Sequence, residues 1–204
     1  MKQRGVIYVA IGEKYLKEIS NSLESLRRYM PDLSVTIFTD QVGYEEKNTK
    51  FVYIKENKPP KIIRIECLNR SDYEITMYLD ADTLIQNDFL EVFDLLKEAD
   101  LAVSNGHKKV LTKYPNIDQD ILLMNCGVLL YKNTDAVREF FNSWLENYKT
   151  YLDLETKDEP SFYFTLLKER IDFIVLPDEY NYRGNIASYS KKGIKVLHGQ
   201  VGGL

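Results

Sequence analysis

The chain has 204 residues, a formal net charge of −4, and 44% hydrophobic and 28% charged residues. This length fits one α/β domain or at most two small ones, and the mild acidity gives no support for a nucleic-acid partner. There is no signal-like leader, no stretch near the roughly 20 apolar residues of a membrane span, and only two cysteines, so we expect a reduced, cytoplasmic protein.

Hydrophobic periodicity divides the chain into alternating strands and helices. The helix at 13–29, for example, has Leu16, Ile19, Leu23 and Leu26 on one face and Pro31 just beyond its end. Such alternation predicts a single α/β domain with a mostly parallel central sheet and helices on both faces. In chain order we expect a strand at 5–11, a helix at 13–29, strands at 34–39 and 51–55, a helix from 60 to about 69, a strand ending at Leu79, a helix at 89–98, a strand at 101–104, a polar loop at 105–120, a strand at 126–131, helices at 135–151 and 161–170, a strand at 173–176 and a loop-like end.

Residues 75–85, Ile-Thr-Met-Tyr-Leu-Asp-Ala-Asp-Thr-Leu-Ile, carry the most functional information. A buried-strand pattern leads directly into Asp80 and Asp82, and side chains two positions apart on a strand point to the same side. Two neighbouring carboxylates repel each other, and an apolar strand solvates them poorly. A divalent cation would remove that conflict, and Mg²⁺ typically binds one or two carboxylates together with substrate phosphates. Because ligands of such sheets bind at the carboxyl ends of the strands, we expect a metal–diphosphate site there.

The order of several segments resembles a known family. Tyr-Leu-Asp-Ala-Asp-Thr-Leu is followed by Asn-Cys-Gly-Val-Leu-Leu, then Leu-Pro-Asp-Glu-Tyr-Asn-Tyr, and then by a late histidine, His198. Together they are similar to nucleotide-sugar glycosyltransferases of the GT-A fold, in particular the glycogenin and lipopolysaccharide-galactosyltransferase group, glycosyltransferase family 8. The resemblance covers nearly the whole chain. It implies one GT-A domain at 1–204, with a nucleotide-binding half at about 1–104 and an acceptor and catalytic half at about 105–204.

The resemblance also implies roles for individual residues. Asp80, Asp82 and His198 would bind Mn²⁺ or Mg²⁺, and the donor would be a UDP-sugar. Arg64 would lie near the donor sugar and phosphates, and Asp158 and Glu159 would lie beside the transferring sugar, so Arg64 and Asp158 are the catalytic candidates. The remaining donor-binding candidates are Ala10, Ile11, Gly12 and Tyr15 near the uracil and ribose, Ala81 between the two aspartates, and Asn105, Asn125, Cys126 and Gly127 around the sugar.

Two departures from the family pattern matter. The group often has a lysine after the late histidine that binds the pyrophosphate, and here no lysine follows His198. The pyrophosphate charge would then be met by the metal, Arg64 and either Lys61 or Arg183. The chain is also short, so acceptor-binding elements are either reduced or carried on a further domain, and the acceptor is expected to be a saccharide or a protein glycan.

Other interpretations of the same residues remain open. Asp80-Ala81-Asp82-Thr83 also fits a haloacid-dehalogenase-type phosphatase, with Asp80 as nucleophile and Asp82 as general acid, although that motif usually opens its domain. A sugar-phosphate nucleotidyltransferase shares much of the fold but has a glycine-rich first loop that is missing here. A non-catalytic nucleotide-sugar-binding module is the third alternative. Among single residues, Asp158 could simply cap the helix after Pro160, Arg64 could face solvent, and Cys126 could be core packing.

Overall fold

The protein is described here from a computed structural model, which covers residues 2–55, 57–109, 122–153, 157–184 and 193–199. None of the helices in these ranges is long and apolar enough to cross a bilayer. The elements in chain order are β1 (Lys2–Ala10), α1 (Glu13–Tyr29), β2 (Ser34–Thr39), β3 (Thr49–Tyr53), α2 (Pro60–Leu68), β4 (Tyr73–Leu79), β5 (Thr83–Ile85), the 3₁₀ helix η1 (Leu90–Lys97), β6 (Leu101–Lys109), β7 (Leu122–Lys132), α3 (Asp135–Tyr151), α4 (Glu159–Lys168), β8 (Phe173–Leu176), the 3₁₀ turn η2 (Asp178–Tyr180) and β9 (Val196–His198).

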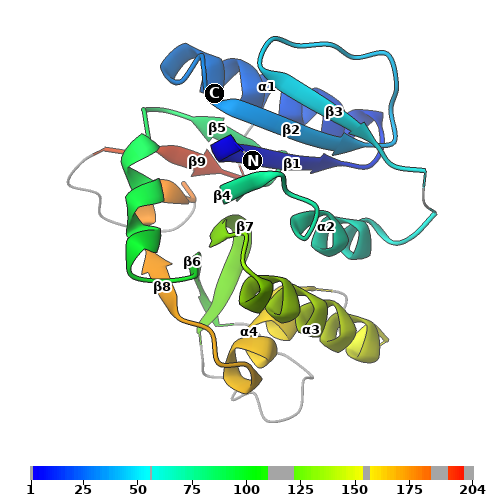
Figure 1. Ribbon diagram of the computed structural model, residues 1–204, viewed down its shortest axis with the longest axis vertical. Helices are drawn as coiled ribbons and strands as arrows, with labels where there is room; N and C mark the ends of the chain where they lie inside the picture. Colours follow the sequence, from blue (N-terminus) through cyan, green and yellow to red (C-terminus); the bar gives the residue numbers. More distant parts are fainter. Residues whose placement is uncertain (1, 56, 110–121, 154–156, 185–192, 200–204) are drawn as a thin grey trace.

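Seven strands form one central sheet in the order β3-β2-β1-β4-β7-β6-β8 (Figure 1). The strands β3, β2, β1 and β4 are parallel to one another, β7 is antiparallel to both of its neighbours, and β6 and β8 are parallel. The mostly parallel α/β fold predicted from the sequence is therefore confirmed. The reversed strand β7 is the means by which the second half of the chain joins the sheet beside β4.

Two hydrophobic clusters lie on the two faces of this sheet. Alternate residues of β1 divide between them, because successive side chains on a strand point to opposite faces. Val6 and Tyr8 pack with the apolar stripe of α1 and with η1, whereas Ile7 packs with α2, α3 and α4. The second cluster holds most of the large aromatic side chains, including Trp144 and Phe162, whose ring centroids are 4.9 Å apart. The positions of α1, α2, α3 and α4 are thus fixed by core packing.

The order of the strands creates a switch point between β1 and β4. From β1 the chain moves outward to β2 and β3, and it then returns through α2 to place β4 on the other side of β1. Connections that leave on opposite sides open a crevice at the carboxyl ends of the two central strands, where ligands of such sheets bind. Ala10 ends β1 and Leu79 ends β4, so Asp80 follows at the crevice.

Several boundaries differ from the sequence-based expectation. Residues 105–109, expected in a polar loop, extend β6, and β7 begins at Leu122 rather than at 126. Backbone hydrogen bonds carry this pairing past two register shifts, so it does not depend on an apolar pattern. The remainder of the expected loop, 110–120, lies outside the described residues. The expected helix at 89–98 is the 3₁₀ helix η1, and the expected helix at 161–170 begins earlier, at Glu159.

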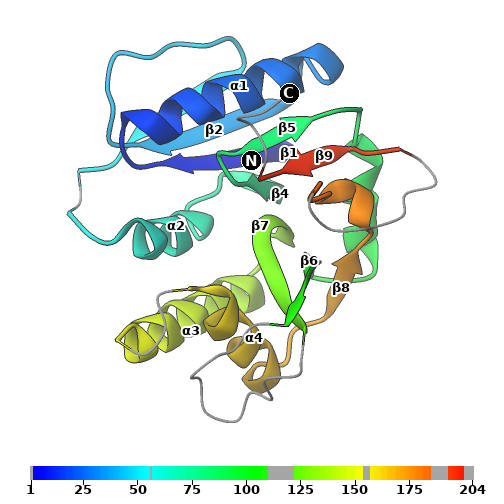
Figure 2. The same cartoon turned by 180° about the vertical axis from the view of Figure 1, so that it is seen from behind.

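Residues around His198, which were expected in a loop-like end, are also more ordered than expected, while 200–204 lie outside the described residues. Instead of a loop, residues 196–198 form β9, which pairs antiparallel with β5 in a separate two-stranded ribbon. Figures 1 and 2 both show the two short strands side by side, beside the carboxyl end of β4. Thr83 lies opposite His198 in this ribbon, so a residue near the end of the chain is carried next to the aspartate pair.

Candidate active site

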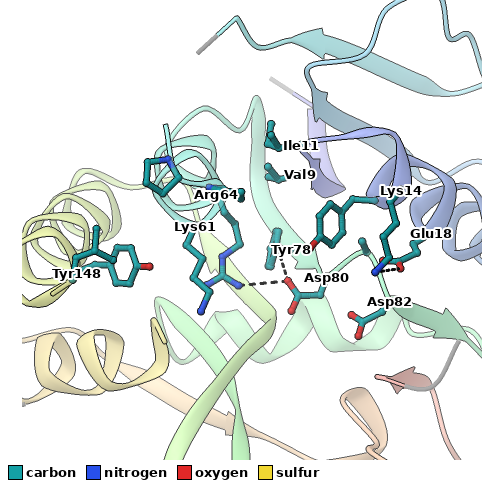
Figure 3. A pocket seen from close by; sticks show the side chains of 15 residues that line it. Val9, Ile11, Lys14, Glu18, Lys61, Arg64, Tyr78, Asp80, Asp82 and Tyr148 are labelled. Atoms are coloured by element: carbon teal, nitrogen blue, oxygen red, sulfur yellow. Dashed lines mark hydrogen bonds and ion pairs between the residues drawn. The ribbon is translucent and has the colours of Figure 1, made fainter. Parts of the chain in front are cut away.

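Asp80 lies at the centre of the site, directly after β4. Its backbone N–H donates a hydrogen bond to the carbonyl of Gly127 at 2.8 Å, which ties it to β7. Its carboxylate accepts a hydrogen bond from the hydroxyl of Tyr78 and lies 3.5 Å from Nη1 of Arg64 (Figure 3). Tyr78 and Asp80 are two positions apart in an extended segment, so both point to the same side of the sheet. Asp80 is therefore held from two directions before any ligand is considered.

The ribbon of β5 and β9 brings His198 to the two aspartates. Nε2 of His198 lies 3.5 Å from Oδ2 of Asp80 and 3.3 Å from Oδ1 of Asp82. The backbone N–H of Gly199 donates to the carbonyl of Asp82 at 3.1 Å and closes the ribbon at this end. The structure thus brings together the three residues that the resemblance implied as metal ligands.

The donor set of Asp80, Asp82 and His198 fits a divalent cation. One ligand atom from each residue can be chosen such that all three lie within 4.8 Å of one another. Gly127 makes room for this cluster: a Cβ added there would lie 2.2 Å from Cε1 of His198 and 2.7 Å from Oδ2 of Asp80. Two carboxylates and one imidazole leave coordination positions for water and substrate oxygens, as catalytic sites for such ions require.

Asp80 and His198 shift each other's pKa in opposite directions. Burial favours a higher pKa for Asp80, but the hydrogen bond with His198 and the charge of Arg64 outweigh it and hold the pKa of Asp80 well below its usual range. Burial favours a lower pKa for His198, but its hydrogen bonds and charge interactions with Asp80 and Asp82 raise that pKa to about 9. In the metal-free protein near neutral pH, an imidazolium therefore occupies the place where the two carboxylates need a positive charge.

A second charged cluster lies on the other side of Asp80. Arg64 on α2 forms a close ion pair with Asp158, and Nζ of Lys61 lies 3.2 Å from Oδ1 of Asp158. The side chains of Arg64 and Asp158 are only 13% and 6% exposed. The guanidinium also lies over the rings of Tyr78 and Trp144, at 5.5 and 5.6 Å from their centroids. Arg64 is therefore not a solvent-facing helix residue.

Asp158 occupies the N-cap position of α4 but makes no capping hydrogen bond with its side chain. The capping interpretation is therefore wrong, and the carboxylate turns instead toward Lys61 and Arg64. The indole N–H of Trp144 donates to Oγ of Ser161 at 2.9 Å, which fixes α4 against α3. The position of Asp158 thus follows from the packing of three helices.

A pocket of about 690 Å³ opens beside these two clusters, at the switch point of the sheet. This volume is in the range of sites for small molecules and cofactors. Figure 3 shows Lys61, Arg64 and the carboxylate of Asp80 facing the same space, with Tyr148 on the far side. The residues that line the pocket come from β1, α1, α2, the end of β4 and α3: Val9, Ile11, Lys14, Tyr15, Glu18, Pro59, Pro60, Lys61, Arg64, Tyr78, Asp80, Ala81, Asp82, Tyr148 and Leu152.

Only some of the donor-binding residues expected from the resemblance line the pocket. Arg64, Ile11, Tyr15, Asp80, Ala81 and Asp82 line the pocket. Gly12, with φ of +98°, forms the turn between β1 and α1, whereas Ala10 is fully buried. The others are not among the lining residues: Asn105 lies in β6 opposite Met124, Asn125 and Cys126 are buried in β7, Gly127 lies against His198, and Glu159 begins α4. Burial raises the pKa of the Cys126 thiol, as expected of a core cysteine.

Several site residues were not identified from the sequence. Tyr78 was detectable in principle, because strand alternation places it on the same side as Asp80. Asp40, whose Oδ1 accepts a hydrogen bond from the N–H of Gly12 at 2.8 Å, follows β2 as Asp80 follows β4. Lys14 and Glu18 lie on a helix face that no local pattern distinguishes from ordinary surface, and Tyr148 is one of the buried residues of α3.

Comparison with known proteins supplies a family and a fold. The nucleotide-diphospho-sugar transferase family matches residues 68–196, and no curated protein sequence matches the chain. Among solved structures, the galactosyltransferase LgtC in complex with donor and acceptor sugar analogues is 15% identical at a TM-score of 0.68, over 95% of this chain and 86% of LgtC. An active-site mutant of LgtC gives a TM-score of 0.70 with the same identity and coverage. The glycosyltransferase GlyE of Streptococcus pneumoniae TIGR4 is 16% identical at 0.69, over 97% of this chain and 54% of GlyE.

Proposed function

The chain belongs to the nucleotide-diphospho-sugar transferase family and is a glycosyltransferase, and on that basis we propose that it transfers a sugar from a UDP-sugar to an acceptor hydroxyl with the help of bound Mn²⁺ or Mg²⁺. One observation carries the proposal. Asp80, Asp82 and His198 converge at the edge of a pocket of about 690 Å³. The pocket lies at the switch point of the sheet, where a diphosphate linked to a nucleoside and a sugar finds both apolar walls and charged groups.

The charged groups suit a leaving diphosphate. A divalent cation bound by Asp80, Asp82 and His198 would supply neutralisation of the negative charge that develops on the leaving group. Lys61 and Arg64 face the same space from α2 and offer donors to phosphate and sugar oxygens. Arg183 provides a further cation near the metal ligands. A Cβ added to Gly199 would lie 3.7 Å from Nη2 of Arg183 and 3.9 Å from Oδ2 of Asp82, so both side chains flank this glycine. Lys61, Arg64 and Arg183 replace, in our proposal, the lysine that the family often has after the late histidine.

The nucleoside would occupy the end of the pocket formed by β1 and α1. Val9 and Ile11 provide an apolar wall, and the ring of Tyr15 is half exposed beside them. Aromatic rings stack well on bases, and the turn at Gly12 presents backbone groups that Asp40 holds in place. Uridine is the nucleoside we propose for this end.

Asp158 has a different role from a free general base in this arrangement. Lys61 and Arg64 both compensate its charge, and the side chain is buried. A carboxylate in such a pair orients the guanidinium and can accept hydrogen bonds from sugar hydroxyls. We therefore assign Asp158 to positioning Arg64 and the donor sugar. We propose that Glu159, the next residue, also lies beside the donor sugar.

The acceptor would enter from the half of the chain at about 105–204. Tyr148 and Leu152 on and after α3 line the end of the pocket opposite α1. We propose that a saccharide acceptor occupies this end, where Tyr148, only 2% exposed, forms part of the pocket wall without offering its ring face. A protein-linked glycan satisfies the same chemistry.

Calorimetry with UDP in the presence of Mn²⁺, of Mg²⁺ and of EDTA tests the proposal. We expect binding that requires the cation and that survives in Asn133→Leu, a change at the opposite end of the sheet. Equal affinity for UDP in EDTA would overturn the metal dependence. Tighter binding of another nucleoside diphosphate would overturn the donor assignment. Hydrolysis or transfer from a panel of UDP-sugars then identifies the sugar.

The alternatives considered from the sequence are not favoured. A haloacid-dehalogenase-type phosphatase would use Asp80 as a nucleophile, but the family match and the fold identify a glycosyltransferase. The same match argues against a nucleotidyltransferase and a non-catalytic module.

A further inference from the structure

Two buried asparagines stand behind the candidate metal ligand His198. Oδ1 of Asn181 lies 2.7 Å from Nδ1 of His198, on the side of the ring that faces away from the aspartates. Nδ2 of Asn181 donates to Oδ1 of Asn125 at 2.8 Å, and the same Oδ1 accepts from the backbone N–H of Gly127 at 3.2 Å. Asn181, Asn125 and His198 are only 3%, 6% and 5% exposed. The three side chains thus form a hydrogen-bonded relay, shielded from water, that begins at the backbone N–H of Gly127.

The direction of every hydrogen bond in this relay is fixed by its first member. A backbone N–H can only donate, so Asn125 must present its oxygen to Gly127. That oxygen also faces Asn181, which must therefore present its NH₂ group to Asn125 and its own oxygen to His198. An amide oxygen can only accept, so Nδ1 of His198 must carry a hydrogen. Neither amide can be rotated by 180° without placing donor against donor or acceptor against acceptor.

The consequence appears at the other ring nitrogen. With its hydrogen on Nδ1, a neutral His198 has its lone pair on Nε2, the nitrogen that lies 3.5 Å from Asp80 and 3.3 Å from Asp82. Histidines that bind metals generally donate their other N–H to a neighbouring acceptor, which fixes the ring and raises its basicity as a ligand.

We infer that Asn181, held in orientation by Asn125, is a positioning residue that fixes the ring and the tautomer of His198 for cation binding at Nε2. This rests on the proposed metal site. Asn125, implied by the family resemblance to line the sugar pocket, then acts from behind the metal ligand, and Asn181 gains a role that its motif alone did not indicate.

The main test compares two substitutions at Asn181. Asn181→Leu keeps the size of the side chain but removes both hydrogen bonds, so the dissociation constant for Mn²⁺, measured by titration without nucleotide, should rise about 10–100-fold. Asn181→Asp keeps an acceptor for the Nδ1–H but loses the donor to Asn125, so it should recover part of the affinity. Asn133→Leu is the matched control, because Nδ2 of Asn133 donates to a backbone carbonyl at 3.0 Å at the other end of β4. It should leave the affinity unchanged.

Nuclear magnetic resonance provides a second readout that does not depend on affinity. In the wild type and in Asn181→Asp, loaded with diamagnetic Mg²⁺, the Nδ1–H proton of His198 should give a signal protected from exchange with water. Asn181→Leu should lose it. If Asn181→Leu fails to fold, Asn125→Ala serves instead, since it frees the amide of Asn181 to rotate and should also weaken Mn²⁺ binding.

The outcomes separate this inference from the proposed function. Failure of the wild type to bind either cation would overturn both. Cation binding by the wild type that is unchanged in Asn181→Leu, or equally weak in Asn181→Leu and Asn181→Asp, would overturn the positioning role alone. In the second case Asn181 would support the fold without acting through Nδ1 of His198.

Discussion

The two sides of Asp80 are built in contrasting ways. On one side, Arg64 and Asp158 are embedded among three helices and the aromatic rings of the second hydrophobic cluster. On the other side, Asp82 and His198 lie next to a ribbon of two three-residue strands, and Asn181 holds the ring of His198 from behind. Both members of the first cluster are largely buried, whereas in the second cluster His198 is buried but the side chain of Asp82 is 43% exposed. Substitutions on the first side should mainly change stability, and those on the second side should mainly change ligand binding.

The largest expected effect on stability is that of Asp158→Ala. This change leaves the buried guanidinium of Arg64 without its closest partner, and removal of one member of a buried pair typically costs about 3–5 kcal/mol. Denaturant unfolding of the metal-free protein measures the loss. The double variant Arg64→Met with Asp158→Leu is the control, because it removes both charges and should regain part of the stability. A loss in Asp158→Ala below about 1 kcal/mol would contradict the view that this cluster belongs to the core.

Gly127→Ala should lower both the stability of the protein and its affinity for Mn²⁺. Its Cβ would collide with Cε1 of His198 and approach Oδ2 of Asp80, and overpacking of this kind typically costs about 1–3 kcal/mol. Mn²⁺ affinity should fall as well, because the ligands are pushed apart. Gly5→Ala is the matched control, since its Cβ would lie 2.4 Å from the ring of Tyr73, far from the site. It should lower stability but leave the Mn²⁺ affinity of the folded protein unchanged.

The pH dependence of the metal-free protein should report on His198. The folded pKa of about 9 is raised above the ordinary value of 6.5, so its stabilisation is fully present below pH 6.5 and is lost as the pH rises through about 9. The size of this effect is smaller than that of Asp158→Ala, because Asp82 is 43% exposed and solvent screens it. Titration of the imidazole by NMR in the wild type and in Asp82→Ala measures it, and the pKa should fall in the variant. A wild-type pKa near 6.5 would show that the two carboxylates do not hold the ring.

The smallest effect on stability is expected for Asp82→Ala. Its carboxylate is 43% exposed, so solvent screens its attraction to His198, and the free energy of unfolding should change by no more than about 1 kcal/mol. Metal-dependent UDP binding should nevertheless be lost, since one of three cation ligands is gone. Calorimetry and unfolding on the same sample compare the two properties. A loss of stability as large as that of Asp158→Ala would erase the distinction between the two sides.

The central part of the fold was predictable because it depends on local patterns. Amphipathic periodicity gave the helices 13–29 and 135–151 with the bounds that the structure has, and an apolar strand ending in Asp80 indicated the edge of the sheet where the site lies. The implied family and the GT-A type of fold are confirmed by the family match and by the likeness to LgtC. The helices and strands followed from hydrophobic periodicity, whereas the family followed from the order of the motifs that contain Asp80, Cys126 and Asn181.

The contacts that complete the site could not be predicted in this way. The strand β9 has three residues, too few for a periodic signal, and it forms because β5 offers a partner. The burial of Asp158 depends on how α2, α3 and α4 pack, which no spacing in the sequence reveals. Asn181 was visible within Tyr-Asn-Tyr, but its partners lie 17 and 56 positions away. Contacts of long range follow from the packed structure and not from local preference.

The pairing of β5 with β9 has a consequence for the chain as a polymer. Asp82 and His198 enclose 115 residues, so an ion bound between them would close this stretch of chain into a long loop, as a disulfide would. Closing such a loop reduces the entropy of the open chain by an amount that grows slowly with its length. The contact should therefore form late in folding, after β1 and β4 have joined. Donor and cation together would then act as a removable cross-link, and resistance of the C-terminal segment to proteases would depend on whether substrate is bound.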